Sequence, residues 1–251
     1  MLSRAETCFF ERDPSVALCR RATVEGIGTL LLMLAATGSG LMAQRLVPAG
    51  GILVLMTSAV ATAGALVSLI VAFGAVSGGH FNPLITLLQW LGRERTLPCT
   101  LGYVAAQFAG AATGAVFANK VFASAVRPLV FAPPTWALIA SETLATAGLM
   151  IVVFGCARSG KAGTGPFAVG AWLVAAIVAT PSNSYANPAI SFAAIFADGP
   201  IALPAAKAWP YLAAETVGAL MAFAVIAIAY PRCTHATAPA SIASTSPGAL
   251  P

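Results

Sequence analysis

Residues 77–87 read SGGHFNPLITL and place an Asn-Pro pair directly after a long apolar stretch. Residues 183–191, NSYANPAIS, repeat this arrangement about a hundred residues later. Asparagine is a favoured helix cap and proline is favoured at the first helical position, so each pair predicts the start of a helix. The apolar run after the first pair ends at Gly92, which makes that helix about half as long as one that crosses a bilayer.

The composition indicates a membrane protein. Of the 251 residues, 59% are hydrophobic and 8% are charged, whereas about 25% are charged in an ordinary soluble domain. The segments lack the alternation of apolar and polar residues typical of membrane β-barrels, so the expected fold class is all-α. Apolar stretches long enough to cross the roughly 30 Å hydrocarbon core as helices recur at residues 22–43, 51–73, 101–123, 135–156, 163–180 and 210–230.

Positive charges predict the orientation of the chain in the membrane. Nine of the 13 Lys and Arg residues lie before the first expected span or after the second, fourth and sixth. These nine are Arg4, Arg12, Arg20, Arg21, Arg93, Arg95, Arg158, Lys161 and Arg232, and the other four are Arg45, Lys120, Arg127 and Lys207. The positive-inside rule therefore predicts that both termini are cytoplasmic. Because this placement accounts for the net charge of +5, we expect the lipid bilayer as a partner and no nucleic acid.

The two halves of the chain are related in sequence. YVAAQFAGA at residues 103–111 aligns with YLAAETVGA at 211–219, and the Asn-Pro pairs fall in nearly the same register. Residues from about 15–125 thus match about 133–231. Each half holds three spans, and an odd number inserts the second half upside down relative to the first. The two short helices should then enter from opposite sides and meet near the bilayer midplane.

These motifs resemble those of the aquaporin and glycerol facilitator family, the major intrinsic proteins. SGGHFNPLITL is similar to that family's first signature, usually SGGHFNPAVTL, and SYANPAISF to its second, which usually ends NPARSF. VEGIGTLLL at 24–32 and AQFAGA at 106–111 also fit. The resemblance covers about residues 20–230. It implies six transmembrane helices and two re-entrant half-helices around a pore, usually assembled as a homotetramer with a pore in each subunit.

The expected organisation is one channel domain at residues 20–231, between a cytoplasmic segment at 1–19 and a tail at 232–251. The tail is rich in Ala, Ser, Thr and Pro, which is typical of a disordered segment. Bacterial members of the family with an apolar residue after the second motif resemble the sequence most. We therefore expect an integral protein of a bacterial inner membrane.

The resemblance also implies roles for individual residues. The two pore motifs comprise Asn82, Pro83, Leu84, Asn187, Pro188 and Ala189. The segments before them would present backbone carbonyls to the pore at Gly78, Gly79, His80, Phe81, Ser182, Asn183, Ser184 and Tyr185. Glu25 and Glu142 would accept hydrogen bonds from the amides of these segments. The half-helix N-termini carry positive partial charge and repel cations, whereas neutral hydrogen-bonding solutes pass.

The expected selectivity filter departs from the family pattern. Ile190 stands where the family usually has arginine, and counting back from the two asparagines gives Thr62 and Ser184. The fourth position falls among Ala175, Ala176 and Ile177. None of these residues is charged or aromatic, so we expect a wide filter of low polarity. It would pass uncharged solutes such as glycerol-like polyols and undissociated metalloid acids such as arsenite, while the rate for water stays open.

Two other functions stay open at this point. An ion- or proton-coupled secondary transporter can use the same inverted repeat, with Glu25 or Glu142 as the proton-binding group. Glu215 aligns with Gln107, however, and a carboxylate that an amide can replace is weak evidence for proton chemistry. A non-conducting scaffold, plugged by Leu84, is the third hypothesis. His80 would line the pore or serve as a pH gate.

The sequence favours neither an enzyme nor a cofactor protein. It contains no phosphate-binding loop and no nucleophile–base signature, and its five cysteines form no CxxC pair. We therefore expect no metal and no cofactor.

Overall fold

The computed structural model describes residues 16–47, 51–123, 133–161 and 163–230 of the chain. In these residues all regular structure is helical, which confirms the predicted fold class. The described residues form five long helices and one of 15 residues, α6; these are α1 (Leu18–Leu46), α2 (Ile52–Ser77), α4 (Leu97–Val121), α5 (Trp136–Arg158), α6 (Gly165–Ala179) and α8 (Ala205–Ala229). The short elements are α3 (Pro83–Leu91), α7 (Pro188–Ala193) and the 3-10 turns η1 (Ala194–Phe196) and η2 (Gly199–Ile201).

Each predicted span corresponds to one long helix, but the helix ends differ from the apolar limits. Five of the helices are long and apolar enough to cross a membrane, and α6 is a shorter apolar helix of 15 residues. Helix α1 begins four residues before the predicted span at 22–43, because a helix continues past the hydrocarbon core wherever its backbone bonds can form. Most of the predicted N-terminal segment, 1–15, and the predicted tail, 232–251, lie outside the described residues.

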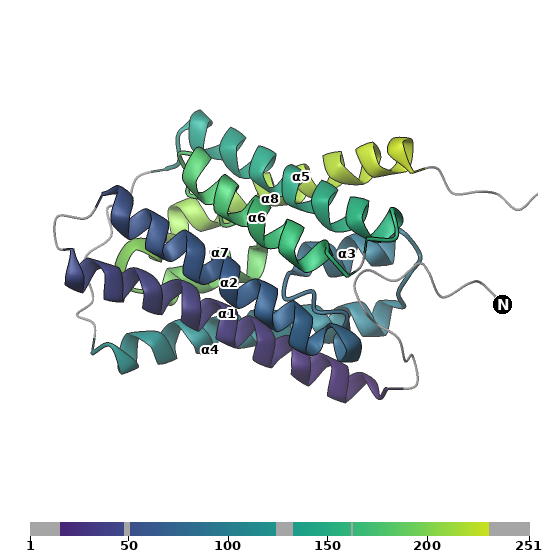
Figure 1. Ribbon diagram of the computed structural model, residues 1–251, viewed down its shortest axis with the longest axis horizontal. Coiled ribbons are helices and arrows are strands. Elements are labelled where there is room, and N and C mark those ends of the chain that lie inside the picture. The colour runs from purple at the N-terminus through teal and green to yellow at the C-terminus, as the bar shows by residue number, and fades with distance from the viewer. Residues whose placement is uncertain (1–15, 48–50, 124–132, 162, 231–251) are drawn as a thin grey trace, which may run out of the picture.

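The helices of each half pack together. Helix α1 packs mainly on α4, α5 mainly on α8, and α2 contacts both α1 and α6. Figure 1 shows α1, α2 and α4 on one side of the molecule and α5, α6 and α8 on the other. The start of α1 and the end of α8 lie at the same end of the bundle, as an even number of crossings requires (Figure 1).

Two contacts join connections that the charge pattern assigns to the same side. Arg158, at the end of α5, forms an ion pair with Glu94, in the link that follows α3. Arg45, at the end of α1, donates to the carbonyl of Phe122, at the end of α4, and lies over its ring at 5.2 Å. The basic links after α3 and α5 therefore lie beside each other. The C-terminal ends of α1 and α4 likewise lie beside each other.

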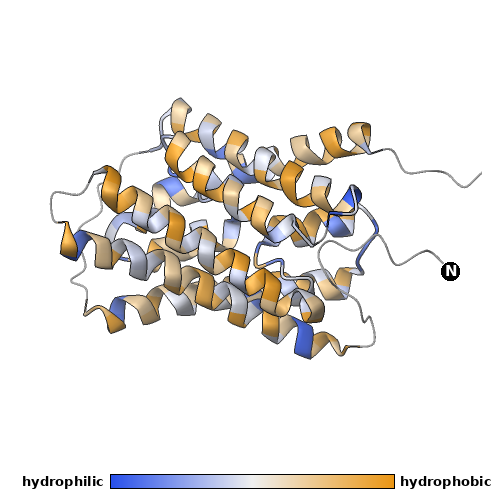
Figure 2. Ribbon diagram, viewed as in Figure 1, coloured by the Kyte–Doolittle hydropathy of each residue, from blue (hydrophilic) through white to orange (hydrophobic). Residues whose placement is uncertain are grey.

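The exterior is apolar and the interior contains polar groups, which is the reverse of a soluble protein. Large hydrophobic side chains face outward, among them Trp136 and Ile228, which are 81% and 82% exposed. Figure 2 shows this hydrophobic colouring along the outer helices. Glu25, Glu142 and Glu215 are each fully buried. A lipid environment explains the exterior, and ionisable groups buried at such depth need specific partners.

Glycine permits the close crossings of α1 with α4 and of α5 with α8. A Cβ added at Gly110 of α4 would lie 2.1 Å from the carbonyl oxygen of Gly26. A Cβ at Gly218 of α8 would lie 2.2 Å from the carbonyl oxygen of Thr143. The two glycines are equivalent in the repeat, so both halves use the same small-residue contact between backbones.

This contact predicts the effect of Gly218→Ala. The added methyl group must push α8 away from α5, and overpacking of this kind typically costs about 1–3 kcal/mol. The apparent Tm of the purified protein in detergent should fall by several degrees. Gly64→Ala in α2 is the matched control, since a Cβ there meets nothing within 4 Å. An equal Tm for the two variants would contradict the packing argument.

Candidate functional site: two re-entrant segments around one cavity

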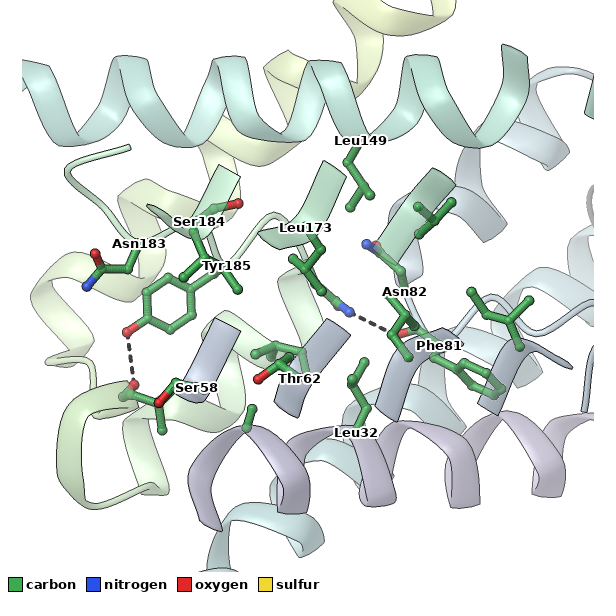
Figure 3. A pocket seen from close by; sticks show the side chains of 18 of the residues that line it. Leu32, Ser58, Thr62, Phe81, Asn82, Leu149, Leu173, Asn183, Ser184 and Tyr185 are labelled. Carbon is green, nitrogen blue, oxygen red and sulfur yellow. Dashed lines mark hydrogen bonds between the residues drawn. The ribbon is translucent and has the colours of Figure 1, made fainter. Parts of the chain in front are cut away.

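A cavity runs between the two halves of the protein. Its lining comes from α1, α2, α5, α6 and both segments that carry the Asn-Pro pairs. One part of the wall is polar and consists of Gly79, His80, Phe81, Asn82, Asn183, Ser184, Tyr185 and Asn187. The rest of the lining is largely aliphatic and includes Leu32, Leu66, Ile70, Leu149, Val153, Val169, Leu173 and Ile177. Figure 3 shows Asn183, Ser184 and Tyr185 on one side of the cavity, facing Ser58 and Thr62 of α2.

The two half-helices begin at the asparagines of the motifs. Asn82 Oδ1 accepts a hydrogen bond from the amide of Leu84 at 2.9 Å, and Asn187 Oδ1 accepts one from the amide of Ala189 at 3.1 Å. Each asparagine therefore caps its own helix, with proline at the first helical position. Because the capping bond holds Oδ1 of each asparagine, it also fixes the direction in which Nδ2 of the same side chain points.

The asparagines also bind each other's segment. Asn82 Nδ2 donates to the carbonyl oxygen of Ala186 at 2.9 Å, and Asn187 Nδ2 donates to that of Phe81 at 2.8 Å. Each amide nitrogen has two hydrogens. One is used in this crosswise bond, and since both asparagines line the cavity, the second is available to a solute oxygen.

The segments that lead to the half-helices have the same backbone shape. Three positions in each segment have positive φ, and they are paired at a spacing of 105 residues. The pairs are Gly78 (φ 97°) with Asn183 (61°), Gly79 (64°) with Ser184 (45°), and Phe81 (47°) with Ala186 (47°). The left-handed region costs a non-glycine residue roughly 1–2 kcal/mol, so surrounding contacts must hold these conformations.

Buried carboxylates supply those contacts. In the first half, Glu25 Oε1 accepts from Ser77 Oγ at 2.6 Å and from the amide of His80 at 3.0 Å. Its Oε2 accepts from the amide of Phe81 at 2.7 Å and from Gln107 Nε2 at 2.8 Å. Four donors thus surround one carboxylate, which holds the segment in place.

The second half uses two carboxylates instead of one. Glu142 accepts from the amides of Tyr185 and Ala186, at 3.1 and 3.0 Å. Glu215, on α8, accepts from the next amide, that of Asn187, at 3.3 Å. Sequence reasoning did not place Glu215 at the site, although its alignment with Gln107 was the available signal.

The residues expected in the filter are only partly brought together. Thr62, Ile177, Ser184 and Ile190 all line the cavity. Ala175 is exposed on the outer surface of α6, and Ala176 is buried but is not among the lining residues. A helix turns by about 100° per residue, so only one of three consecutive positions faces the cavity here.

Other expected site residues lie behind the cavity wall. Gly78 and Ser182 are buried beside their segments without lining the cavity, as are Pro83, Leu84, Pro188 and Ala189. Leu84 is only 2% exposed and packs in the core around the half-helices. The side chain proposed as a plug is therefore accommodated by packing.

Contacts of the two segments with Ile201 and Arg95 were not predicted. Tyr185 donates its hydroxyl to the carbonyl of Ile201 at 2.9 Å, which ties the second segment to η2 (Figure 3). Arg95 lies 3.3 Å from His80 Nε2 and over the ring of Tyr103 at 4.8 Å. The only signal for Arg95 in the sequence was a charge close to the end of the first half-helix.

Comparisons with known proteins agree with this geometry. The sequence profile described as Major intrinsic protein matches residues 14–196. The chain is 34% identical over 215 residues to "Aquaglyceroporin AqpS" of Rhizobium meliloti (strain 1021), covering 83% of this chain and 89% of that protein. It is 32% identical over 249 residues to "Probable aquaporin TIP2-2" of Oryza sativa subsp. japonica, covering 90% and 94%.

The fold is also similar to a solved structure, "X-ray structure of the aquaglyceroporin from Plasmodium falciparum". The TM-score is 0.69 at 18% sequence identity, over 84% of this chain and 96% of that chain. The inverted helices, the paired Asn-Pro caps and these matches lead to one conclusion. The chain belongs to the major intrinsic protein family and is an integral membrane channel for small solutes rather than an enzyme.

Proposed function

We propose that this channel passes uncharged solutes larger than water, of the glycerol or undissociated metalloid-acid class such as arsenite, through a filter without arginine. The observation that carries the proposal is the group Thr62, Ile177, Ser184 and Ile190 on one cavity. Among the described residues that line this cavity there is no Asp, Glu, Lys or Arg. The printed name of the Rhizobium relative, an aquaglyceroporin, also supports a solute larger than water.

A cavity lined by both polar and aliphatic groups suits a polyol or a small neutral acid. The polar groups of the two segments would supply hydrogen-bond partners to such a solute. The aliphatic side chains of the lining, such as Leu173 and Val169, would contact its apolar part. A neutral solute can therefore exchange its bonds to water for bonds to the protein, whereas an ion loses hydration without adequate compensation.

Coupled transport receives no support from the placement of the carboxylates. Glu25, Glu142 and Glu215 are absent from the cavity lining and bind backbone amides of the segments instead. We infer passive flux, which follows the gradient of the solute alone. Glycerol uptake by proteoliposomes should be the same with and without an imposed pH or sodium gradient, and uptake driven by either gradient would revive the transporter hypothesis.

The basic connections and the family resemblance support two further inferences. Both termini are cytoplasmic, and the protein assembles as a homotetramer with one pore in each subunit. Chemical cross-linking of the protein in native membranes tests the second, since a series that ends at four subunits is expected.

Substituting arginine for Ile190 tests the filter. The long charged side chain would narrow the cavity beside Thr62 and Ser184, so glycerol uptake should fall by about tenfold or more, equivalent to about 1.4 kcal/mol in the barrier. Stopped-flow swelling of proteoliposomes in glycerol and water gradients measures this. Ile190→Val is the control, because it keeps the position apolar. Unchanged glycerol uptake by Ile190→Arg would refute the filter argument.

Replacing Asn187 by aspartate tests cation exclusion. The carboxylate keeps the cap on Ala189 but removes the donor to Phe81 and places negative charge at the two half-helix N-termini. Potassium leak from loaded vesicles should rise severalfold. Asn183→Asp is the matched control, because Asn183 lines the cavity at an exposed position where water screens the charge. Equal leak for the two variants would show that the helix N-termini do not set the barrier.

A further inference from the structure

Corresponding polar residues surround the two re-entrant segments, with one chemical difference. The equivalent positions are Glu25 and Glu142, Ser77 and Ser182, Thr86 and Ser191, and Gln107 and Glu215. At the last pair the first half has an amide and the second half a carboxylic acid. Gln107 and Glu215 are both fully buried, so the difference cannot be offset by water at the surface.

In the first half the amide is a donor. Gln107 Nε2 donates to Glu25 Oε2 at 2.8 Å and lies 3.2 Å from Thr86 Oγ1. This bond completes the set of four donors around the Glu25 carboxylate. A single negative charge is thus buried with full hydrogen bonding, as such a charge requires.

In the second half, an ionised Glu215 could not donate a hydrogen bond to Glu142 as Gln107 does to Glu25. An ionised carboxylate only accepts hydrogen bonds, whereas a protonated one has an O–H to donate. Glu215 Oε1 accepts from the amide of Asn187 and from the hydroxyl of Ser191. Its Oε2 is buried and has no hydrogen-bond partner. Gln107 Oε1 in the first half is likewise buried without a partner, but only the carboxylate oxygen of Glu215 can take up a proton and donate it.

Glu142 is the acceptor that such a proton needs. Glu142 and Glu215 bind consecutive backbone amides, those of Ala186 and Asn187, so the two carboxylates lie against the same short stretch of backbone. Two ionised carboxylates at such a site repel each other, and with both fully buried the repulsion is little screened. A shared proton removes the repulsion and restores the donor–acceptor bond of the first half.

No described cation lies near enough to replace the proton. Helices α3, α6 and α7 and the turn η1, which pack on α5 or α8, contain no charged residue. Lys207 of α8 is eight residues from Glu215, about 12 Å along a helix, and Arg158 of α5 is sixteen residues from Glu142, about 24 Å. The titratable side chains beside the pair are the phenols of Tyr185, whose amide donates to Glu142, and of Tyr211, whose ring centroid lies 5.8 Å from that of Tyr185.

We propose that Glu142 and Glu215 form a proton-binding site in which one shared proton holds the second re-entrant segment in place. The site lies behind the cavity wall, so the proton is structural and is not transported. The bonded form exists while the pair keeps its proton. As the pH rises and the proton leaves, two negative charges face the segment and its stabilisation is lost. The first half, with Gln107, has no such step.

The test compares apparent Tm values of the purified full-length protein at several pH values between 6 and 9. The wild-type Tm should fall with rising pH by about 2–4 °C or more, which is the shift expected for about 1 kcal/mol in a protein of this size. Glu215→Gln gives the second half the amide of the first, so its Tm should stay level over the same range. Equal pH profiles for the two proteins would overturn the proposal.

The reciprocal variant Gln107→Glu is the matched control. It places a second acid beside Glu25, and a new fall of Tm with pH should result. The double variant Gln107→Glu/Glu215→Gln should keep a pH-dependent Tm, now set by the first half. A Gln107→Glu protein with no added pH dependence would contradict the proposal, since equivalent surroundings should give equivalent behaviour.

Infrared spectroscopy of the wild-type protein needs no variant to fold. A protonated carboxyl band should be present near neutral pH and disappear as the pH rises, and in Glu215→Gln it should be absent. If the wild-type band is absent throughout, or if Tm at fixed pH rises with sodium concentration instead, the proton is not the occupant. These measurements do not depend on which solute the channel passes, so they stand apart from the proposed function.

Discussion

The two halves of the protein are joined at their centre by two hydrogen bonds, from Asn82 to the carbonyl of Ala186 and from Asn187 to that of Phe81. The bonds matter because the N-termini of α3 and α7 carry like partial charges that repel each other. Each asparagine resolves this with one side chain, whose oxygen neutralises its own helix end and whose nitrogen binds the facing segment. The two bonds fix one carbonyl in each segment, that of Phe81 and that of Ala186.

These two hydrogen bonds need rigid support, because both segments have backbone conformations that most residues avoid. The support comes from the spanning helices through the buried glutamates, and the close glycine crossings keep those helices in register. The cavity is therefore the result of contacts behind its wall. This explains why most of the fully buried polar side chains belong to the supporting layer, and few of them reach the lumen.

Much of this arrangement was predictable from the sequence. The paired motifs and the offset repeat predicted the all-helical fold, the six long helices and the two short ones, because these features depend on hydropathy and capping. Counting from Asn82 and Asn187 gave Thr62 and Ser184, and both line the cavity. The count left Ala175, Ala176 and Ile177 open, because the residue that faces the cavity depends on the rotation of the helix about its axis.

Long-range polar contacts were the least predictable. The repeat aligned Glu215 with Gln107, but the alignment alone suggested that the two residues are interchangeable. The hydrogen bonds show the difference, because Gln107 donates to Glu25, whereas Glu215 accepts from Asn187 and Ser191 and keeps one oxygen without a partner. Likewise, the approach of Arg95 to His80 depends on how the link after α3 folds back, and a one-dimensional pattern contains no information on that path.

The two re-entrant segments share a backbone shape but differ in what they present to a solute. At two of the left-handed positions the first segment has glycine, Gly78 and Gly79, whereas the second has Asn183 and Ser184. At these two positions the first segment therefore has only backbone groups. It has no side chain there that a mutation could exchange for another. The second has changeable side chains on the same framework. In this channel, the side chains that can vary at these left-handed positions therefore belong to the second segment.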